Sequence, residues 1–166
     1  AVTYLDSMFR EASAFNNPIG AWRVDQVTTT REMFRDARSF NQPLGSWRVD
    51  SVTDMSKMFQ EAKYFNQDLG DWQIDKVTTM QEVFQRAKAF DQDLGWCVDH
   101  SVDMDDAFDS TPCKSTSCGV THGICWGRDN KRSGIGLGLA IIVCVVASVV
   151  LMLAVSSCFL AGTFGS

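Results

Sequence analysis

One apolar pattern recurs every 25 residues over roughly the first two thirds of the chain, and this period constrains the fold more than any other feature. A period of this length is typical of repeat proteins, in which each repeat buries its apolar face only against its neighbours. The recurring positions are Val2, Val27, Val52, Val77 and Val102; Phe9, Phe34, Phe59 and Phe84; Phe15, Phe40, Phe65 and Phe90; and Trp22, Trp47 and Trp72.

Each repeat divides into two halves with different spacing. Val52, Met55 and Phe59 follow helical spacing, and Thr53 stands where a helix N-cap is expected. We therefore expect a helix near 54–63, with copies near 4–13, 29–38 and 79–88. In the second half, Trp72 and Ile74 alternate with polar residues, which is the period of a short strand with one buried face.

The repeat motif itself resembles a known family. The pattern Val-Thr-x-Met-x-x-Met-Phe-x-x-Ala-x-x-Phe-Asn-Gln-x-Leu-Gly-x-Trp is similar to the repeat of mycoplasma surface lipoproteins and of BspA-like leucine-rich-repeat surface proteins, and covers residues 1 to about 109. The resemblance implies a leucine-rich-repeat-like solenoid displayed on a cell surface. It implies no particular ligand.

These patterns together predict an α/β solenoid with a right-handed coil and one short helix and one short parallel strand in each 25-residue turn. The equivalent positions are expected to form buried columns. The predicted columns are Val27/Val52/Val77, Phe34/Phe59/Phe84, Phe40/Phe65/Phe90, Leu44/Leu69/Leu94 and Trp22/Trp47/Trp72.

The chain is expected to have four parts. Residues 1–112 form the solenoid with its C-terminal cap, and 113–134 form a cysteine-containing juxtamembrane segment and linker. Residues 135–155 carry no charge and are long enough, at about 1.5 Å rise per residue, for a transmembrane helix. Residues 156–166 form an uncharged tail. Because no polar capping repeat precedes the first repeat, we expect the chain to be a fragment or to follow further repeats.

Four cysteines lie between the repeats and the apolar stretch: Cys97, Cys113, Cys118 and Cys125. An even set in an extracellular setting predicts two disulfides. Three connectivities are possible, and we favour Cys97–Cys113 with Cys118–Cys125. Zinc is the competing interpretation, but the sequence holds no Cys-x-x-Cys pair. Cys144 and Cys158 are expected to be free, and Cys158 is also a candidate for acylation.

Polar side chains between the buried strand positions are the candidate ligand-binding residues. They are Arg23, Asp25, Arg48, Asp50, Asp71, Gln73 and Asp75. Equivalent positions on parallel neighbours would lie about 4.8 Å apart, so the stacked aspartates need a counter-charge. We expect each Asp to accept turn N–H groups and to be offset by its neighbouring Arg, and the alternative is a stripe for a cation or a basic ligand. Asn16, Asn41, Asn66 and Asp91 are expected to satisfy loop backbone groups.

No motif for catalysis, a cofactor or a metal stands out. The two histidines, His100 and His122, sit in no nucleophile pattern, and no phosphate loop or dinucleotide fingerprint occurs. Five aspartates crowd the end of the repeats, but their spacing fits no EF-hand, and we expect a solvated cap. The formal net charge of −5 argues against nucleic acid as a partner.

Location and orientation give conflicting signals. Arg128, Lys131 and Arg132 precede the apolar stretch, which by the positive-inside rule favours repeats in the cytosol. The cysteines and the family resemblance favour repeats outside the cell, and we expect a single-pass protein of the plasma membrane with extracellular repeats. A lipid-anchor signal that is removed on processing is a further alternative.

We expect a non-catalytic surface module for adhesion, or for recognition of a protein or glycan, that uses the polar strand positions. The expected partners are the membrane and such a ligand, without nucleic acid. The alternative function is a structural spacer or coat that associates weakly with itself through its repeats.

Overall fold

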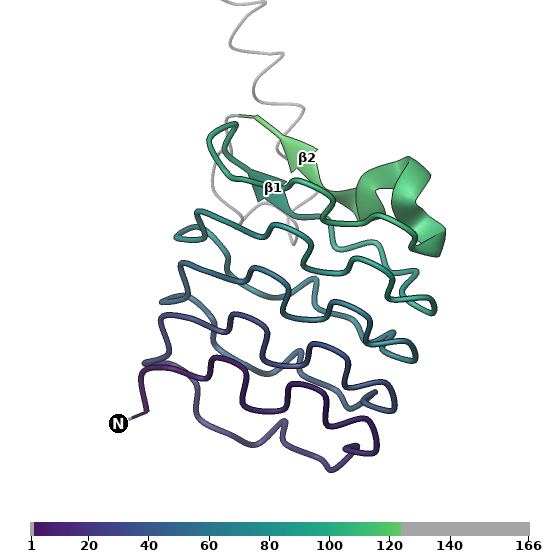
Figure 1. Cartoon of the computed structure of the whole chain (residues 1–166). Helices are drawn as coiled ribbons and strands as arrows, with labels where there is room; N and C mark the ends of the chain where they lie inside the picture. Colours follow the sequence, from purple (N-terminus) through teal and green to yellow (C-terminus); the bar gives the residue numbers. More distant parts are fainter. Residues whose placement is uncertain (1, 124–166) are drawn as a thin grey trace, which may run out of the picture. The chain divides into compact units, whose positions relative to one another are not determined.

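A computed structural model of the chain describes residues 2–123, and in these residues the 25-residue units lie one above the other as stacked coils (Figure 1). Consecutive coils are joined at the same position by isolated parallel bridges, which link Tyr4 to Thr29, Thr29 to Asp54, Asp54 to Thr79, and Thr79 to Asp103. The repeat seen in the sequence is therefore a repeat in space.

The coils contain neither the helices nor the strands that were expected. In the described residues the regular elements are β1 (Cys97–Val98), the 3₁₀ helix η1 (Pro112–Gly119) and β2 (Thr121–His122), with β1 and β2 paired in parallel. The prediction of an α/β solenoid with one helix and one strand in every turn is wrong.

The backbone conformation explains why the segment near 54–63 is not helical. Lys57 and Glu61 both have a positive φ, of 57° each, and the equivalent positions of the other coils share it. A left-handed residue interrupts a right-handed helix. The full set is Ser7, Glu11, Glu32, Asp36, Lys57, Glu61, Glu82, Arg86, Asp106 and Ser110. The apolar residues keep the three- and four-residue spacing of a helix, but here the backbone changes direction every few residues at the positions with positive φ.

Hydrogen bonds between coils replace the hydrogen bonds of a helix. The N–H of Leu5 donates to Thr29 (3.2 Å), that of Thr30 to Asp54 (3.0 Å), and that of Met55 to Thr79 (3.0 Å). Three more chains of the same kind begin at the N–H groups of Ser7, Phe9 and Glu11. In all four chains the N–H donates from one coil to the carbonyl of the following coil.

The threonines expected as helix N-caps also bond between coils. The hydroxyl of Thr53 donates to the carbonyl of Thr28 at 3.2 Å, and the hydroxyl of Thr78 donates to the carbonyl of Thr53 at 3.1 Å. The backbone N–H groups of the same threonines donate to the same carbonyls. These side chains therefore tie each coil to the one before it.

The predicted core columns are confirmed, with one exception at the first coil. Val52, Phe59, Phe65 and Leu69 are buried, as are their equivalents in the neighbouring coils, whereas Trp22 is 39% exposed. The phenylalanines stack along the coils, with ring centroids of Phe34 and Phe59 5.4 Å apart and those of Phe59 and Phe84 5.3 Å apart. Aromatic rings contribute large buried areas, so these columns dominate the apolar core.

The stack continues past residue 112. The N–H of Leu94 donates to Cys118 and that of Thr121 donates to Trp96, so η1 and β2 complete the fifth coil. Cys113 and Cys118 form a disulfide, which contradicts the favoured pairing of Cys97 with Cys113 and of Cys118 with Cys125. Cys97 is also disulfide-bonded.

No helix within residues 2–123 is long and apolar enough to cross a membrane. The expected span 135–155, the tail 156–166, and Cys125, Cys144 and Cys158 lie outside the described residues.

Candidate functional site

The candidate ligand-binding residues lie on one side of the coils, which we call the polar face: Arg23, Asp25, Arg48, Asp50, Asp71, Gln73 and Asp75. Buried side chains between them fix their direction. Val49 is 1% exposed and Ile74 is 3% exposed, so the residues on either side of each point outward. A turn closes after each of them, in which the N–H of Val52 donates to Val49 and that of Val77 donates to Ile74. The alternation expected from the sequence is present without regular strands.

Arginine and aspartate pair within each of the first two rows of the polar face. The Arg48 Nη2 to Asp50 Oδ2 distance is 2.9 Å, and the Arg23 Nε to Asp25 Oδ1 distance is 3.5 Å. The side chains of Arg23 and Arg48 are 89% and 75% exposed. Each pair therefore leaves most of its arginine surface open to a ligand.

These contacts shift the pKa values of the two carboxylates. The hydrogen bond from Arg48 is the main cause that lowers the pKa of Asp50. The pKa of Asp25 is also lowered, chiefly by the hydrogen bond that Gln26 Nε2 donates to it, with Arg23 adding to the effect. The aspartates of both rows stay ionised at neutral pH.

The third row of the polar face is different because Gln73 takes the place of the arginine. Its amide donates to the carbonyl of Asp71 at 3.5 Å. Asp75 lines an open groove of about 440 Å³, together with Lys76, Thr78, Asp99 and other residues. The polar face therefore changes along the stack from Arg–Asp pairs to an amide flanked by carboxylates.

A shallow hollow of about 180 Å³ lies on the first two rows of the polar face. It is lined by Trp22, Arg23, Val24, Asp25, Ser46 and Arg48. Three of the predicted ligand-binding residues, Arg23, Asp25 and Arg48, thus share one concavity with an exposed indole. The sequence did not indicate that Trp22 would take part, because its period predicted a buried position in one column with Trp47 and Trp72, which are themselves buried.

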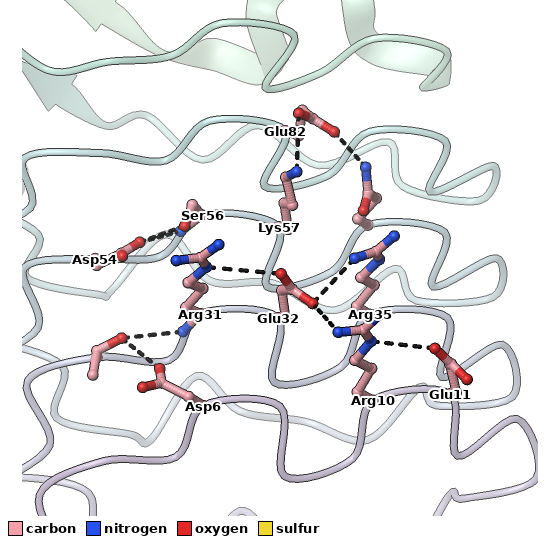
Figure 2. Close-up of polar contacts among 12 residues, drawn as sticks. Asp6, Arg10, Glu11, Arg31, Glu32, Arg35, Asp54, Ser56, Lys57 and Glu82 are labelled. Carbon is pink, nitrogen blue, oxygen red and sulfur yellow. Dashed lines mark hydrogen bonds and ion pairs between the residues drawn. The ribbon is translucent and has the colours of Figure 1, made fainter.

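A second polar cluster was missed by sequence reasoning. Figure 2 shows Glu32 surrounded by three arginines from two coils, with Oε2 2.8 Å from Arg10 Nη1 and 3.1 Å from Arg35 Nη1, and with Oε1 3.7 Å from Arg31 Nε. The 25-residue period could have indicated part of this cluster, since Arg10 and Arg35 occupy equivalent positions of neighbouring repeats.

The electrostatics of Glu32 are set by two opposing effects. Burial of the carboxylate, which is 10% exposed, raises its pKa. The hydrogen bond from Arg35 and the charges of Arg10, Arg35 and Arg31 lower it by more, so the pKa lies below the ordinary value of 4.5. Glu32 is therefore a carboxylate that holds two coils together, and its charge is already neutralised by its neighbours.

The same side of the stack carries an amide and carboxylate cluster higher up. The Gln60 amide nitrogen donates to Glu82 Oε2 at 2.5 Å and to Gln85 Oε1 at 2.7 Å. Lys57 Nζ lies 3.5 Å from Glu82 Oε1. These contacts join two coils, although the buried side-chain oxygen of Gln60 has no hydrogen-bond partner within the described residues, and we assign the cluster to the scaffold.

The asparagine column has the structural role that was expected. The Asn41 side-chain oxygen accepts the N–H of Asn66 at 3.0 Å and the Gln67 amide at 2.8 Å. Asn16 does the same for the coil above it, and Asn66 accepts from Asp91 and Gln92.

Two of the five aspartates at the end of the repeats accept N–H groups of turns. Asp99 Oδ1 accepts the N–H of Ser101 at 2.9 Å, and Asp103 Oδ1 accepts the N–H of Asp105 at 3.0 Å. Within residues 2–123, no group of three or more His, Cys, Asp or Glu side chains is arranged to hold a metal ion. Cys113 and Cys118 are bonded to each other and so are not available as zinc thiolates.

These features define a repeat protein whose 25-residue coils stack in register through parallel hydrogen bonds and aromatic columns. A family model described as "Mycoplasma protein of unknown function, DUF285" matches residues 3–118, and the chain belongs to this family. No curated protein matches the chain, and no solved structure matches it.

Proposed function

We propose that the chain is a non-catalytic recognition module, which binds a protein or glycan through the polar face. The observation that carries the proposal is a pair of exposed arginines on neighbouring coils, each in an ion pair with an aspartate. Arg23 lies 3.5 Å from Asp25, and Arg48 lies 2.9 Å from Asp50. Each pair presents a guanidinium in a fixed position, which lowers the ordering cost of binding. Its ligand would be an extended chain that meets several rows at once.

The hollow beside Trp22 supports a polar ligand with some apolar surface. An exposed indole next to charged hydrogen-bonding groups offers both a flat apolar contact and directed polar contacts. The hollow is shallow and open rather than enclosed, which suits binding more than catalysis.

A location outside the cell is also part of the proposal. The Cys113–Cys118 disulfide supports it, because disulfides persist mainly in oxidising compartments. The resemblance of the repeat to BspA-like leucine-rich-repeat surface proteins and mycoplasma surface lipoproteins points the same way. In this proposal the protein is retained at the plasma membrane with its repeats exposed.

The binding proposal is tested by screening the chain against arrays of glycans and cell-surface proteins. For every hit, the Arg23→Ala/Arg48→Ala variant is compared with a Lys63→Ala/Lys88→Ala variant, which removes the same charge elsewhere on exposed residues. We expect the first variant to lose binding at least tenfold and the second to bind like wild type. Equal binding by both variants would refute the polar face as the site.

The alternative function, a spacer or coat, predicts a different outcome of the same screen. In that case the chain binds only itself, and its sedimentation coefficient rises with concentration. The location is tested separately by adding a protease to intact cells. Repeats that resist cleavage while an external control protein is cut would contradict an extracellular position.

A further inference from the structure

The only two histidines of the chain, 22 residues apart in sequence, are neighbours in the structure. The rings of His100 and His122 lie with their centroids 5.9 Å apart and their planes within 11° of parallel. The β1–β2 pairing brings them together, since it sets His122 beside Val98, two residues before His100. Both side chains are exposed.

We infer that His100 and His122 form a two-histidine site for a borderline divalent metal ion such as Zn²⁺ or Ni²⁺. An imidazole nitrogen binds zinc at about 2.0–2.1 Å, which places the ring centroid roughly 3.2 Å from the ion. Two such rings at tetrahedral to linear angles have centroids about 5–6.4 Å apart. The separation of 5.9 Å lies within this range, and binding requires both rings to turn so that a nitrogen of each is aimed at the same ion.

Both histidines are exposed, which leaves room for the other ligands of an ion. Asp99 is next to His100 and carries its carboxylate on the same exposed loop. No third His, Cys, Asp or Glu of the described chain completes the set, so water or a ligand group fills the remaining positions. Imidazole ligands select Zn²⁺, Ni²⁺ and Cu²⁺ over Ca²⁺ and Mg²⁺, which prefer oxygen.

The position of the pair gives the metal a structural consequence. β1 and β2 have two residues each, and the N–H of Thr121 donates to Trp96 and that of Gly123 to Val98. An ion bound to both rings would link the fourth coil to the fifth at this point, independently of the polar face. The inference therefore does not rest on the proposed recognition function.

The test uses the full 166-residue chain without a histidine tag, in mild detergent, with its free thiols alkylated. Zn²⁺ and Ni²⁺ are titrated by calorimetry, with Mg²⁺ as the comparison. The variants are His100→Asn, His122→Gln and the double variant, and Lys88→Gln serves as a matched surface control. We expect one ion per chain, an affinity at least tenfold weaker in either single variant, and no further loss in the double variant.

Hydrogen exchange provides the second readout. Saturating Zn²⁺ should slow exchange of the Thr121 and Gly123 amides at least fivefold in wild type and leave them unchanged in the double variant. Binding that is equal in wild type and the double variant would overturn the inference. Loss of binding in only one of the single variants would overturn it as well, because it would show a one-histidine site.

Discussion

The indole N–H of Trp72 donates a hydrogen bond to the carbonyl oxygen of Leu44, 2.9 Å away in the preceding coil. The equivalent bonds of Trp47 to Ile19 and of Trp96 to Leu69 are 3.1 Å and 3.2 Å long. Each buried tryptophan thus fills the core of its own coil and satisfies a backbone acceptor of the coil before it.

Replacing Trp72 by Phe should lower the free energy of unfolding by about 1–3 kcal/mol, because the buried Leu44 carbonyl loses its donor. The smaller ring adds a packing loss. Trp22→Phe is the matched control, since Trp22 is 39% exposed, and it should change stability by less than about 0.5 kcal/mol. Urea denaturation followed by circular dichroism measures both. Equal losses in the two variants would show that the bond to Leu44 contributes nothing.

Substitutions of Lys57 test whether the backbone is left-handed at this position. Its φ is 57°, a conformation that Asn tolerates and that is strongly unfavourable for a β-branched residue. Lys57→Asn and Lys57→Val both remove the ion pair with Glu82. We therefore expect the Val variant to be less stable than the Asn variant by about 1–2 kcal/mol. If chemical denaturation ranks the two variants the other way, the backbone here is not left-handed in solution.

Glu32 should make stability depend on pH in the acid range. Its pKa is lowered in the folded protein, so its contribution is complete above the ordinary value of 4.5 and is lost as the pH falls through the folded-state pKa. At pH 7, Glu32→Gln should unfold at lower denaturant than wild type, and the difference should shrink towards pH 3. Glu11→Gln, whose side chain is 67% exposed, is the control. A difference that stays constant from pH 7 to pH 3 would exclude the arginine cluster as its cause.

Substitutions of Asn41 test whether its side chain stabilises the stack as a hydrogen-bond acceptor or only by filling space. Asn41→Ala removes the oxygen that accepts from Asn66 and Gln67, and should cost about 1–3 kcal/mol. Asn41→Asp keeps an acceptor at this position and should cost clearly less at pH 7. The protein already carries Asp91 at the equivalent position of the fourth coil. Thermal unfolding measures the stability of both variants. An equal loss of stability in the Ala and Asp variants would mean that the hydrogen bonds accepted by Asn41 do not contribute.

The period of the sequence was sufficient to place the core. Phe59 and Leu69 were predicted to be buried in columns from their recurrence alone, and they are 0% exposed. The local conformation was not predictable in the same way. Apolar residues three and four apart are compatible with an α-helix and also with the observed backbone, which changes direction at the residues with positive φ. Only the unfavourable φ of residues such as Lys57 separates the two, and side-chain chemistry does not reveal it.

The candidate site was predictable in part for the same reason. Alternation about Val49 and Ile74 indicated which residues of the polar face point outward. The pairing of Arg48 with Asp50 follows from their spacing of two residues. Contacts between coils depend on the register of the stack, so the arginines around Glu32, the hollow at Trp22 and the meeting of His100 with His122 required the structure.

More of the hydrogen-bond chains between coils run towards the last coil than away from it, which gives the stack an electric polarity; the chains through Thr28 and Ser39 run the other way. In the four chains that begin at Leu5, Ser7, Phe9 and Glu11, every peptide group points its N–H towards the last coil. Aligned peptide groups add their dipoles, as they do in a helix, and negative charge is favoured at the N–H end. That end is the segment that carries Asp103, Asp105, Asp106 and Asp109. The crowding of like charges there is therefore offset by the field of the backbone beneath it.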